Sequence, residues 1–462
     1  IFLFLQFIFF FSLPVLAQLD TAWVRRYNGP GDGIDSASSL AVDRSGNVYV
    51  TGSSPGSGTS SDYATIKYAP NGDTLWVRRY NGPGNSEDLA HALAIDDTGN
   101  VYVTGQSVGS GIHYDYTTIK YAPNGDTLWV RRYNGPGNST DNAYALAVDD
   151  SGNVYVTGVS VGSGTSTDYA TIKYAPNGDT LWVRRYNGPG SAPDLASDLA
   201  IDSTGNVYVT GLSGGSGTSD DYATIKYAPN GDTLWVRRYN GPGNSLDRAT
   251  ALEVDNSGNV YVTGSSFGTS GFPPSDYATI KYAPSGDTLW VRRYNGTGNS
   301  SDGATALALD GNGNVYVTGS SSGSGTLSDY ATIKYASKGD TLWVRRFNPG
   351  GDDVPMELVV DGSGNFYVTG FSFSSPTSRD YATIKYVYTC VDTAGDANGD
   401  GKILLSDIII IINYLFKGAT LNPLCRGNVN AKDSVKLSDV IYLINFLFKS
   451  GPAPIKSEEC CL

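Results

Sequence analysis

The sequence predicts an all-β fold, a seven-bladed β-propeller of four-stranded antiparallel blades, followed by a small α-helical C-terminal domain. Three observations predict this organisation: a seven-fold internal repeat, turn signals and aromatic residues throughout that repeat, and a change of composition after Cys390. We therefore expect the propeller over residues 18–388 and the C-terminal module over residues 389–462.

The repeat is marked by the segment W-V-R-R-[YF]-N, which contains every tryptophan of the chain. Each copy is followed by D-x-x-G-N-[VF]-Y-V-T-G and then by D-Y-[AT]-T-I-K-Y, and successive copies lie 53 residues apart except for one step of 55. A unit of this length with several short strand patterns indicates a propeller blade rather than a helical solenoid. The seven tryptophans are Trp23, Trp76, Trp129, Trp182, Trp235, Trp290 and Trp343.

Four strands are expected in each copy. In the first complete copy they are Leu40–Val42 (strand A), Asn47–Thr51 (strand B), Asp62–Tyr68 (strand C) and Leu75–Tyr80 (strand D). Asn71-Gly72 between the last two favours a hairpin, because both residues tolerate a positive φ. The array begins with a lone strand D, so we expect Trp23–Tyr27 to complete the last blade beside Asp380–Tyr386.

The core D-x-A-x-A-[LI]-A-[VI]-D-x-x-G-N-V-Y-V-T-G, as at Asp141–Gly158, resembles the SBBP family of bacterial β-propeller repeats. The resemblance covers roughly residues 21–388 and recurs seven times. It implies an extracellular or cell-surface propeller. It does not imply one activity, because propellers host both binding and catalysis.

The N-terminal 17 residues are almost entirely apolar and end in the small-residue pattern Val15-Leu16-Ala17, which predicts a signal peptide whose start is missing. An uncleaved anchor is the alternative, and either places the rest of the chain outside the cytoplasm. No other apolar stretch is long enough to span a bilayer. The net charge of −13, without a basic stripe, argues against nucleic acid and anionic membranes as partners.

The connections between strands B and C vary among the copies, whereas the A–B and C–D turns are nearly identical. One variable loop face on a rigid scaffold is typical of a binding surface, with neutral drift as the alternative. Aromatic side chains in these loops are candidates for stacking on sugars or peptides. They are Tyr114, Phe267 and Phe272.

An aspartate lies 12 residues after the tryptophan in six copies. These are Asp35, Asp88, Asp141, Asp194, Asp247 and Asp302, and the seventh copy has Pro355 there, with Asp352 and Asp353 close by. A ring of carboxylates at one mouth of the channel would attract a cation. The alternative is that each acid accepts backbone hydrogen bonds that fix one blade to the next. We favour the second interpretation, because a feature repeated in every blade usually serves the blade.

The C-terminal module opens with a calcium-loop pattern. Oxygen ligands at loop positions one, three, five and twelve, with glycine at six, suit Ca²⁺. The expected ligands are Asp396, Asn398, Asp400, the backbone oxygen of Lys402, and Asp407. The second loop aligns Asn428, Asn430, Lys432 and Asp439 with the side-chain positions. Because it offers one carboxylate instead of three, we expect one calcium site per chain.

Two matching helical segments, Leu405–Lys417 and Leu437–Lys449, follow these loops. The paired loop–helix units over residues 394–452 resemble an EF-hand-like type I dockerin. The second loop differs from the calcium-loop pattern of that family. The resemblance implies a cohesin-type scaffold partner, contacted at Leu405, Ser406, Leu437 and Ser438. The alternative is a calcium-stapled terminal domain without that partner. Disulfides are expected here, with the pairing open among Cys390, Cys425, Cys460 and Cys461.

Neither histidine of the chain, His91 or His113, lies in a nucleophile, metal or phosphate motif. We therefore expect a secreted or cell-surface, non-catalytic binding or adhesion propeller with an extracellular glycan or protein ligand. Two alternatives remain open: a carbohydrate-active enzyme, such as a polysaccharide lyase or hydrolase, and a structural surface-layer component. A cluster of non-repeating acids, tyrosine or histidine at the channel mouth would favour the enzyme.

Overall fold

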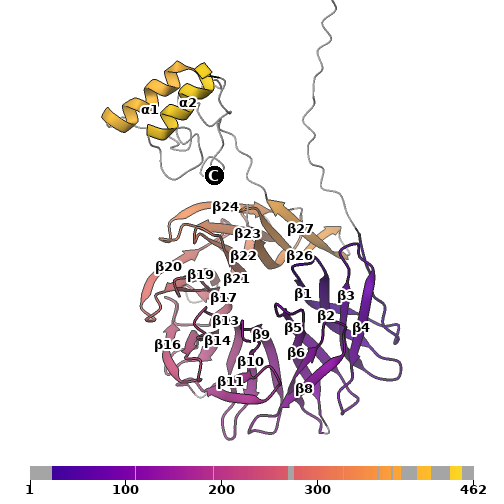
Figure 1. Ribbon diagram of the computed structural model, residues 1–462. Helices are drawn as coiled ribbons and strands as arrows, with labels where there is room; N and C mark the ends of the chain where they lie inside the picture. Colours follow the sequence, from indigo (N-terminus) through magenta and orange to yellow (C-terminus); the bar gives the residue numbers. More distant parts are fainter. Residues whose placement is uncertain are drawn as a thin grey trace, which may run out of the picture. The chain divides into compact units, whose positions relative to one another are not determined.

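A computed structural model describes residues 23–109, 111–190, 192–268, 275–325, 327–348, 350–361, 364–375, 378–386, 403–417 and 437–449. These residues form seven antiparallel sheets, six of four strands and one of three, and two helices. The sheets are the blades of a β-propeller, as the repeat predicts (Figure 1). The chain divides into two compact units, the first with five blades and the second with two blades and the helices.

In the first unit each sheet pairs its strands in chain order, A to D. The A strands are β1 (Ser36–Val42), β5 (Asp88–Ile95), β9 (Asp141–Val148), β13 (Asp194–Ile201) and β17 (Asp247–Val254). The B strands are β2 (Val48–Pro55), β6 (Val101–Val108), β10 (Val154–Val161), β14 (Val207–Gly214) and β18 (Val260–Phe267). The C strands are β3 (Ser61–Tyr68), β7 (Tyr114–Tyr121), β11 (Thr167–Tyr174), β15 (Asp220–Tyr227) and β19 (Ser275–Tyr282). The D strands are β4 (Thr74–Tyr80), β8 (Thr127–Tyr133), β12 (Thr180–Tyr186), β16 (Thr233–Tyr239) and β20 (Thr288–Tyr294).

The second unit repeats the pattern. Its four-stranded sheet contains β21 (Gly303–Leu309), β22 (Val315–Ser322), β23 (Ser328–Tyr335) and β24 (Thr341–Phe347). Its three-stranded sheet contains β25 (Val354–Val360), β26 (Phe366–Ser375) and β27 (Ser378–Tyr386). The helices are α1 (Leu405–Lys417) and α2 (Leu437–Lys449), with the bounds that the internal match predicts.

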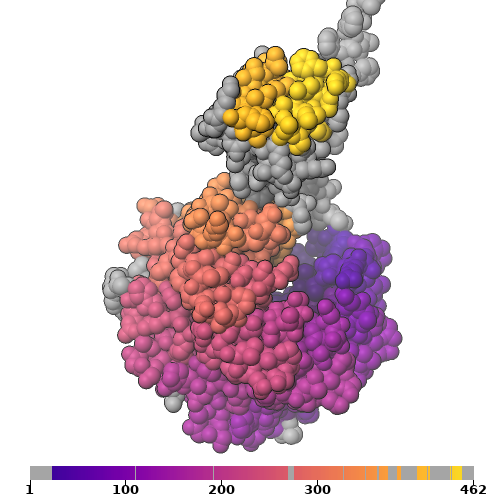
Figure 2. Space-filling model, turned by 60° about the vertical axis from the view of Figure 1, so that its left-hand side comes forward, coloured from indigo at the N-terminus to yellow at the C-terminus, as the bar shows by residue number. Residues whose placement is uncertain are grey.

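Alternation along the B strand builds the core between neighbouring blades of the first unit. Val154 and Val156 of β10 pack with Tyr102 and Trp129 of the preceding blade, whereas Tyr155 between them packs with the following blade. All three β10 side chains are fully buried. Because successive side chains on a strand point to opposite faces, one V-Y-V segment serves two interfaces. The sheets of this unit accordingly follow one another in sequence order (Figure 2).

Hydrogen bonds between blades repeat with the same period. The indole Nε1 of Trp76 on β4 donates to the carbonyl oxygen of Pro123 in the next blade at 3.1 Å. The Nε of Arg78 donates to the carbonyl oxygen of Gly125 at 2.6 Å. The hydroxyl of Tyr63 donates to the carbonyl oxygen of Thr117 at 3.2 Å. In the first five copies the tryptophan and first arginine therefore attach their segment to the C–D turn of the following blade.

Three details differ from the sequence-based prediction. Strands A and B are longer than expected, because β1 begins at Ser36 and β2 continues to Pro55. In the C–D turn only Gly72 adopts a positive φ, 84°, and its N–H donates to the Ala69 carbonyl at 2.8 Å. The hairpin thus needs one left-handed residue rather than two, with a register shift after Lys67 that is typical of a glycine bulge. Residues 23–27 lie outside any strand.

Candidate functional site

The aspartates that begin the A strands are part of the scaffold in the first unit. Asp88, Asp141, Asp194 and Asp247 are fully buried. The carboxylate of Asp141 accepts the Gly135 N–H at 2.7 Å and the Val161 N–H at 3.2 Å. Asp141 thereby joins the D–A connection to the end of strand B of the same blade, and Asp194 makes the same pair of bonds, to the N–H groups of Gly188 and Gly214.

Burial shifts the protonation equilibrium of these carboxylates. Burial raises the pKa of Asp141, although hydrogen bonds from the Gly135 N–H and the Ser160 hydroxyl oppose the shift. The pKa of Asp88, Asp194 and Asp247 is raised for the same reason. Asp35 is only half-buried and accepts the Gly29 N–H at 3.1 Å.

In the seventh copy the position 12 residues after Trp343 is Pro355, and the buried aspartate is Asp353, two residues earlier. Asp353 is fully buried, and its N–H donates to the Ser328 carbonyl at 2.7 Å. The N–H of Asp302, 1% exposed, makes the corresponding bond to Ser275 at 2.6 Å. The connection before β25 is therefore shortened, and Pro355 lies within the strand.

The second arginine is also engaged within its own blade in six of the seven copies. The Nη2 atom of Arg132 donates to the Ser107 carbonyl at 2.6 Å and to the Asp115 carboxylate at 3.0 Å. Equivalent ion pairs join Arg79 to Asp62 and Arg185 to Asp168. The repeated charges thus bind one another, and a ligand site must be sought among the residues that do not repeat.

The D–A and B–C connections of the first unit lie on the same side of the blades, and we call this surface the loop face. The Gly31 N–H donates to the Pro55 carbonyl at 3.1 Å, and the Gly84 N–H to the Val108 carbonyl at 3.1 Å. On the second blade, the hydroxyl of Tyr114 donates to the Glu87 carboxylate at 2.5 Å. This bond, with burial, raises the pKa of Tyr114 to about 12.

Non-repeating apolar side chains are exposed on the loop face. Ile34 in the first D–A connection is 87% exposed, and Ile112 beside Tyr114 is 85% exposed. His113, between Ile112 and Tyr114 in the sequence, is exposed as well. Phe267 is the last residue of β18 and is half-buried, with its N–H donated to Asp247 at 3.2 Å. Phe272 lies outside the described residues.

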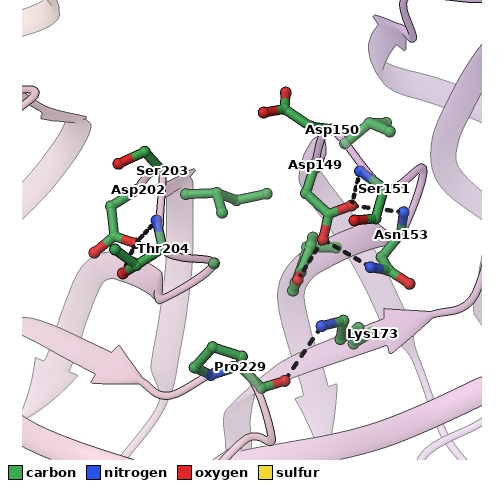
Figure 3. Close-up of a pocket in the computed structure, with 13 residues that line it drawn as sticks. Asp149, Asp150, Ser151, Asn153, Lys173, Asp202, Ser203, Thr204 and Pro229 are labelled. Atoms are coloured by element: carbon green, nitrogen blue, oxygen red, sulfur yellow. Dashed lines mark hydrogen bonds between the residues drawn. The ribbon is translucent and has the colours of Figure 1, made fainter.

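A groove opens on the opposite side, between the A–B turns of the third and fourth blades (Figure 3). It has a volume of about 530 Å³ and is lined by repeated turn residues. The Asp149 carboxylate accepts the N–H groups of Ser151 and Asn153 and the Tyr155 hydroxyl, and Lys173 Nζ donates to the Pro229 carbonyl at 3.2 Å (Figure 3). These polar groups hold the turns together, so the groove belongs to the scaffold.

Sequence reasoning missed one contact between non-repeating residues, on the inner strands. The rings of His91 on β5 and Tyr144 on β9 have centroids 5.6 Å apart. Both occupy a variable position of the repeated core, so only their departure from the small residues found there in the other blades could have identified them. The A strands of neighbouring blades contact one another in this unit, which brings the two rings together (Figure 1).

The two helices pack against each other through a small apolar core. Ile408 and Ile411 of α1 and Val440 and Leu443 of α2 are buried together. The predicted partner-contact residues are all exposed, at the first turn of each helix: Leu405, Ser406, Leu437 and Ser438. No helix among the described residues is long and apolar enough to cross a bilayer.

Asp407 is the one expected calcium ligand within the described residues. It is fully buried, and its Oδ2 atom accepts the Leu404 N–H at 2.7 Å. This is half of a capping box, in which the third residue of a helix binds the backbone just before it. Asp396, Asn398, Asp400 and Lys402 lie outside the described residues, as do the four cysteines. Within the described ranges no group of three or more potential metal ligands occurs.

Fold and contacts together define the propeller part as a set of four-stranded blades made from one repeated unit. The chain contains SBBP β-propeller repeats: the family described as "SBBP: Beta-propeller repeat" matches residues 22–58, 128–164, 181–217, 234–272 and 289–325.

Other proteins are similar to this chain at lower identity. A WD repeat-containing protein of Acanthamoeba polyphaga mimivirus is 22% identical over 468 residues, which cover 88% of this chain and 30% of that protein. The periplasmic gluconolactonase of Pseudomonas aeruginosa matches with 14% identity and a TM-score of 0.43, over 73% of this chain and 98% of its own. The polysaccharide lyase Uly1 matches with 13% identity and a TM-score of 0.46, over 80% of this chain and 93% of its own.

Proposed function

We propose that this chain is an exported, non-catalytic binding propeller that takes a glycan or protein ligand on its loop face. One observation carries the proposal. The repeated acids and arginines bond to one another and to the backbone, whereas non-repeating Ile34 and Ile112 are 87% and 85% exposed on the loop face. Ile34 and Ile112 lie in variable connections on a rigid scaffold, which is the usual location of an interaction surface.

Tyr114 gives this surface an anchor of defined orientation. Its hydroxyl is held by Glu87 at 2.5 Å, so the ring cannot rotate freely. A fixed aromatic ring loses little conformational entropy when a ligand packs on it, which is why tyrosine is frequent at binding hot spots. Ile112 and His113 extend the same surface along the B–C connection.

In this proposal the C-terminal helices attach the propeller to a scaffold partner. Exposed apolar residues occupy matching positions on the two helices: Leu405 with Leu437, Ile409 with Ile441, and Phe416 with Phe448. They support a dockerin-like module that binds a cohesin-type partner. In this proposal the module binds calcium through Asp396, Asn398, Asp400, Lys402 and Asp407. A calcium-stapled terminal domain is the alternative, and binding of the full chain to a purified cohesin distinguishes the two.

A carbohydrate-active enzyme is the second candidate, and the His91–Tyr144 contact favours it, because both residues are non-repeating and lie on inner strands. Asp198 on the inner strand β13 accepts the N–H groups of Leu199 and Leu252, each at 2.8 Å. Both of its carboxylate oxygens are thereby engaged by the backbone, which weighs toward binding rather than acid-assisted cleavage.

The experiment is a screen of the full chain against glycan and peptide arrays, followed by incubation of every bound glycan with the protein. The proposal predicts a ligand that is retained without cleavage or elimination products. Turnover of a bound glycan would support the enzyme, and the absence of any ligand on both arrays would contradict the binding function.

A further inference from the structure

Three side chains that break the repeat gather on the inner strands of the second and third blades. His91 and Tyr144 stand at the fourth position counted from the A-strand aspartate, and the other blades of this unit have small residues there: Ser38, Ser197 and Thr250. Gln106 stands on β6 where the other four sheets of this unit have Ser53, Val159, Leu212 and Ser265. His91 and Tyr144 thus replace small residues at one position of the repeat, whereas the Gln106 position varies from sheet to sheet.

The backbone explains why these side chains project from the sheet. In β5, Ala90 pairs with Gly105 and Ala92 with Thr104, so His91 between them is the extra residue of a β-bulge. In β9, Tyr144 stands in the same way between Ala143 and Ala145. A bulge turns its extra residue out of the ladder. Ala90 and Ala143, which precede the bulges, are buried in the core.

The contacts within the cluster leave binding capacity unused. The His91 Nε2 atom lies 3.4 Å from Gln106 Oε1, and Asn142 Nδ2 donates to the Tyr144 hydroxyl at 3.4 Å. Asn142 Oδ1 is buried and accepts no hydrogen bond from the described residues. Tyr144 remains 37% exposed, whereas Gln106, which contacts His91, is 9% exposed. The cluster thus combines an accessible aromatic ring with a buried acceptor that lacks a donor.

The chemistry of the four residues narrows the ligand. Burial lowers the pKa of His91, so its imidazole is neutral at neutral pH, and the other three side chains carry no charge. A buried acceptor without a donor favours a ligand that brings hydroxyl groups. A sugar ring has hydroxyl groups at its edge and an apolar C–H face that suits an aromatic ring. An anionic ligand would lose hydration without gaining a cation from this cluster.

We propose that His91, Gln106, Asn142 and Tyr144 form a binding site for an uncharged saccharide ring, which stacks on Tyr144 and donates a hydroxyl to Asn142 Oδ1. The site goes beyond the loop-face function, because it lies on the inner strands and uses none of the loop-face residues.

The test is calorimetric titration of the full chain with four neutral oligosaccharides: cellohexaose, xylohexaose, mannohexaose and galactohexaose. Tyr144→Ser and His91→Ser restore the residue type that other blades tolerate at the same bulge, so both variants should keep the melting temperature of the parent. Tyr144→Ser should weaken binding about tenfold or more, corresponding to about 1.4 kcal/mol. Thr250→Ser, at the same bulge of the fifth blade, is the matched control and should leave this binding unchanged.

The outcomes separate the two proposals. Loss of oligosaccharide binding in Tyr144→Ser but not in Thr250→Ser supports the inner-strand site, whatever the loop face binds. If none of the four oligosaccharides binds at millimolar concentration, or if binding survives Tyr144→Ser, the inner-strand site is wrong. Binding only of peptides or of uronic acid oligomers at this cluster would overturn it equally.

Discussion

The indole Nε1 of Trp23 donates to the carbonyl oxygen of Pro70 at 2.9 Å, as the indole of Trp76 donates to Pro123 at 3.1 Å one blade later. The Nε of Arg25 donates to the Gly72 carbonyl at 2.6 Å, and the Tyr27 hydroxyl accepts from Arg79 at 3.2 Å. Residues 23–27 therefore make the contacts that a D strand makes with the blade that follows it.

These contacts underlie the first prediction, that residues 23–27 stabilise the first blade, although they lie outside any strand and the last sheet has three strands. Deleting residues 18–30 should lower the melting temperature sharply or cause aggregation, because the first blade loses its hydrogen bonds to Trp23 and Arg25. Thermal unfolding monitored by circular dichroism measures the effect. Trp23→Ala should reproduce part of it and the exposed Arg26→Ala none, whereas an unchanged melting curve after the deletion would show that these contacts do not stabilise the blade.

The propeller was predictable because its determinants are local and repeated. The V-Y-V alternation, the turn glycines and the seven tryptophans specify strands, turns and blade interfaces without reference to distant residues. The inner-strand cluster was not predictable in the same way. His91 and Tyr144 meet only because two bulges project them from neighbouring A strands, and a bulge is a property of pairing between strands. Glu87 and Tyr114 likewise form a hydrogen bond although they are 27 residues apart in the sequence.

The A–B turn acids should make stability fall in acid. Burial raises the pKa of Asp202, but hydrogen bonds from the Asn206 and Thr204 side chains outweigh it, so the pKa is lowered. An acid with a lowered folded pKa stabilises the fold above its unfolded pKa of about 4, and the stabilisation is lost as pH falls through the folded pKa. The melting temperature of Asp202→Asn should therefore lie several degrees below that of the parent at pH 7 and approach it near pH 2.

Asp141 provides the matched contrast, because burial raises its pKa. Its charged form is disfavoured in the fold, so protonation on lowering the pH relieves a cost instead of removing a stabilisation. The difference in melting temperature between the parent and Asp141→Asn should not shrink between pH 7 and pH 4. If both variants approach the parent with the same pH dependence, the assigned environments are wrong.

Loop-face binding should depend on the aromatic residues there. Replacing Tyr114 and Phe272 with alanine should weaken binding of the array-selected ligand about tenfold or more while leaving the melting curve unchanged. Surface plasmon resonance against the immobilised ligand gives the affinities. Asn71→Ala, in a C–D turn, is the control, and an equal loss of affinity in that variant would show that the loop face is not the binding surface.

Calcium binding should have a stoichiometry near one. The first loop offers carboxylates at three aligned positions, whereas the second offers one and places Lys432 where the first has Asp400. Calorimetric titration of the full chain with Ca²⁺ should show one tight site, absent in Asp396→Ala and unchanged in Asn428→Ala. Two equivalent sites, or one that survives Asp396→Ala, would show that the loops are wrongly assigned.

Hydrogen–deuterium exchange of the full chain, with and without its array-selected ligand, tests the central claim most directly. Binding on the loop face predicts slower exchange at residues 83–87 and 109–116, around the Tyr114–Glu87 bond. The A–B turns at residues 149–153 and 202–206, which line the groove of Figure 3, should exchange at the same rate in both states. Protection of those turns with no change around Tyr114 would contradict the account.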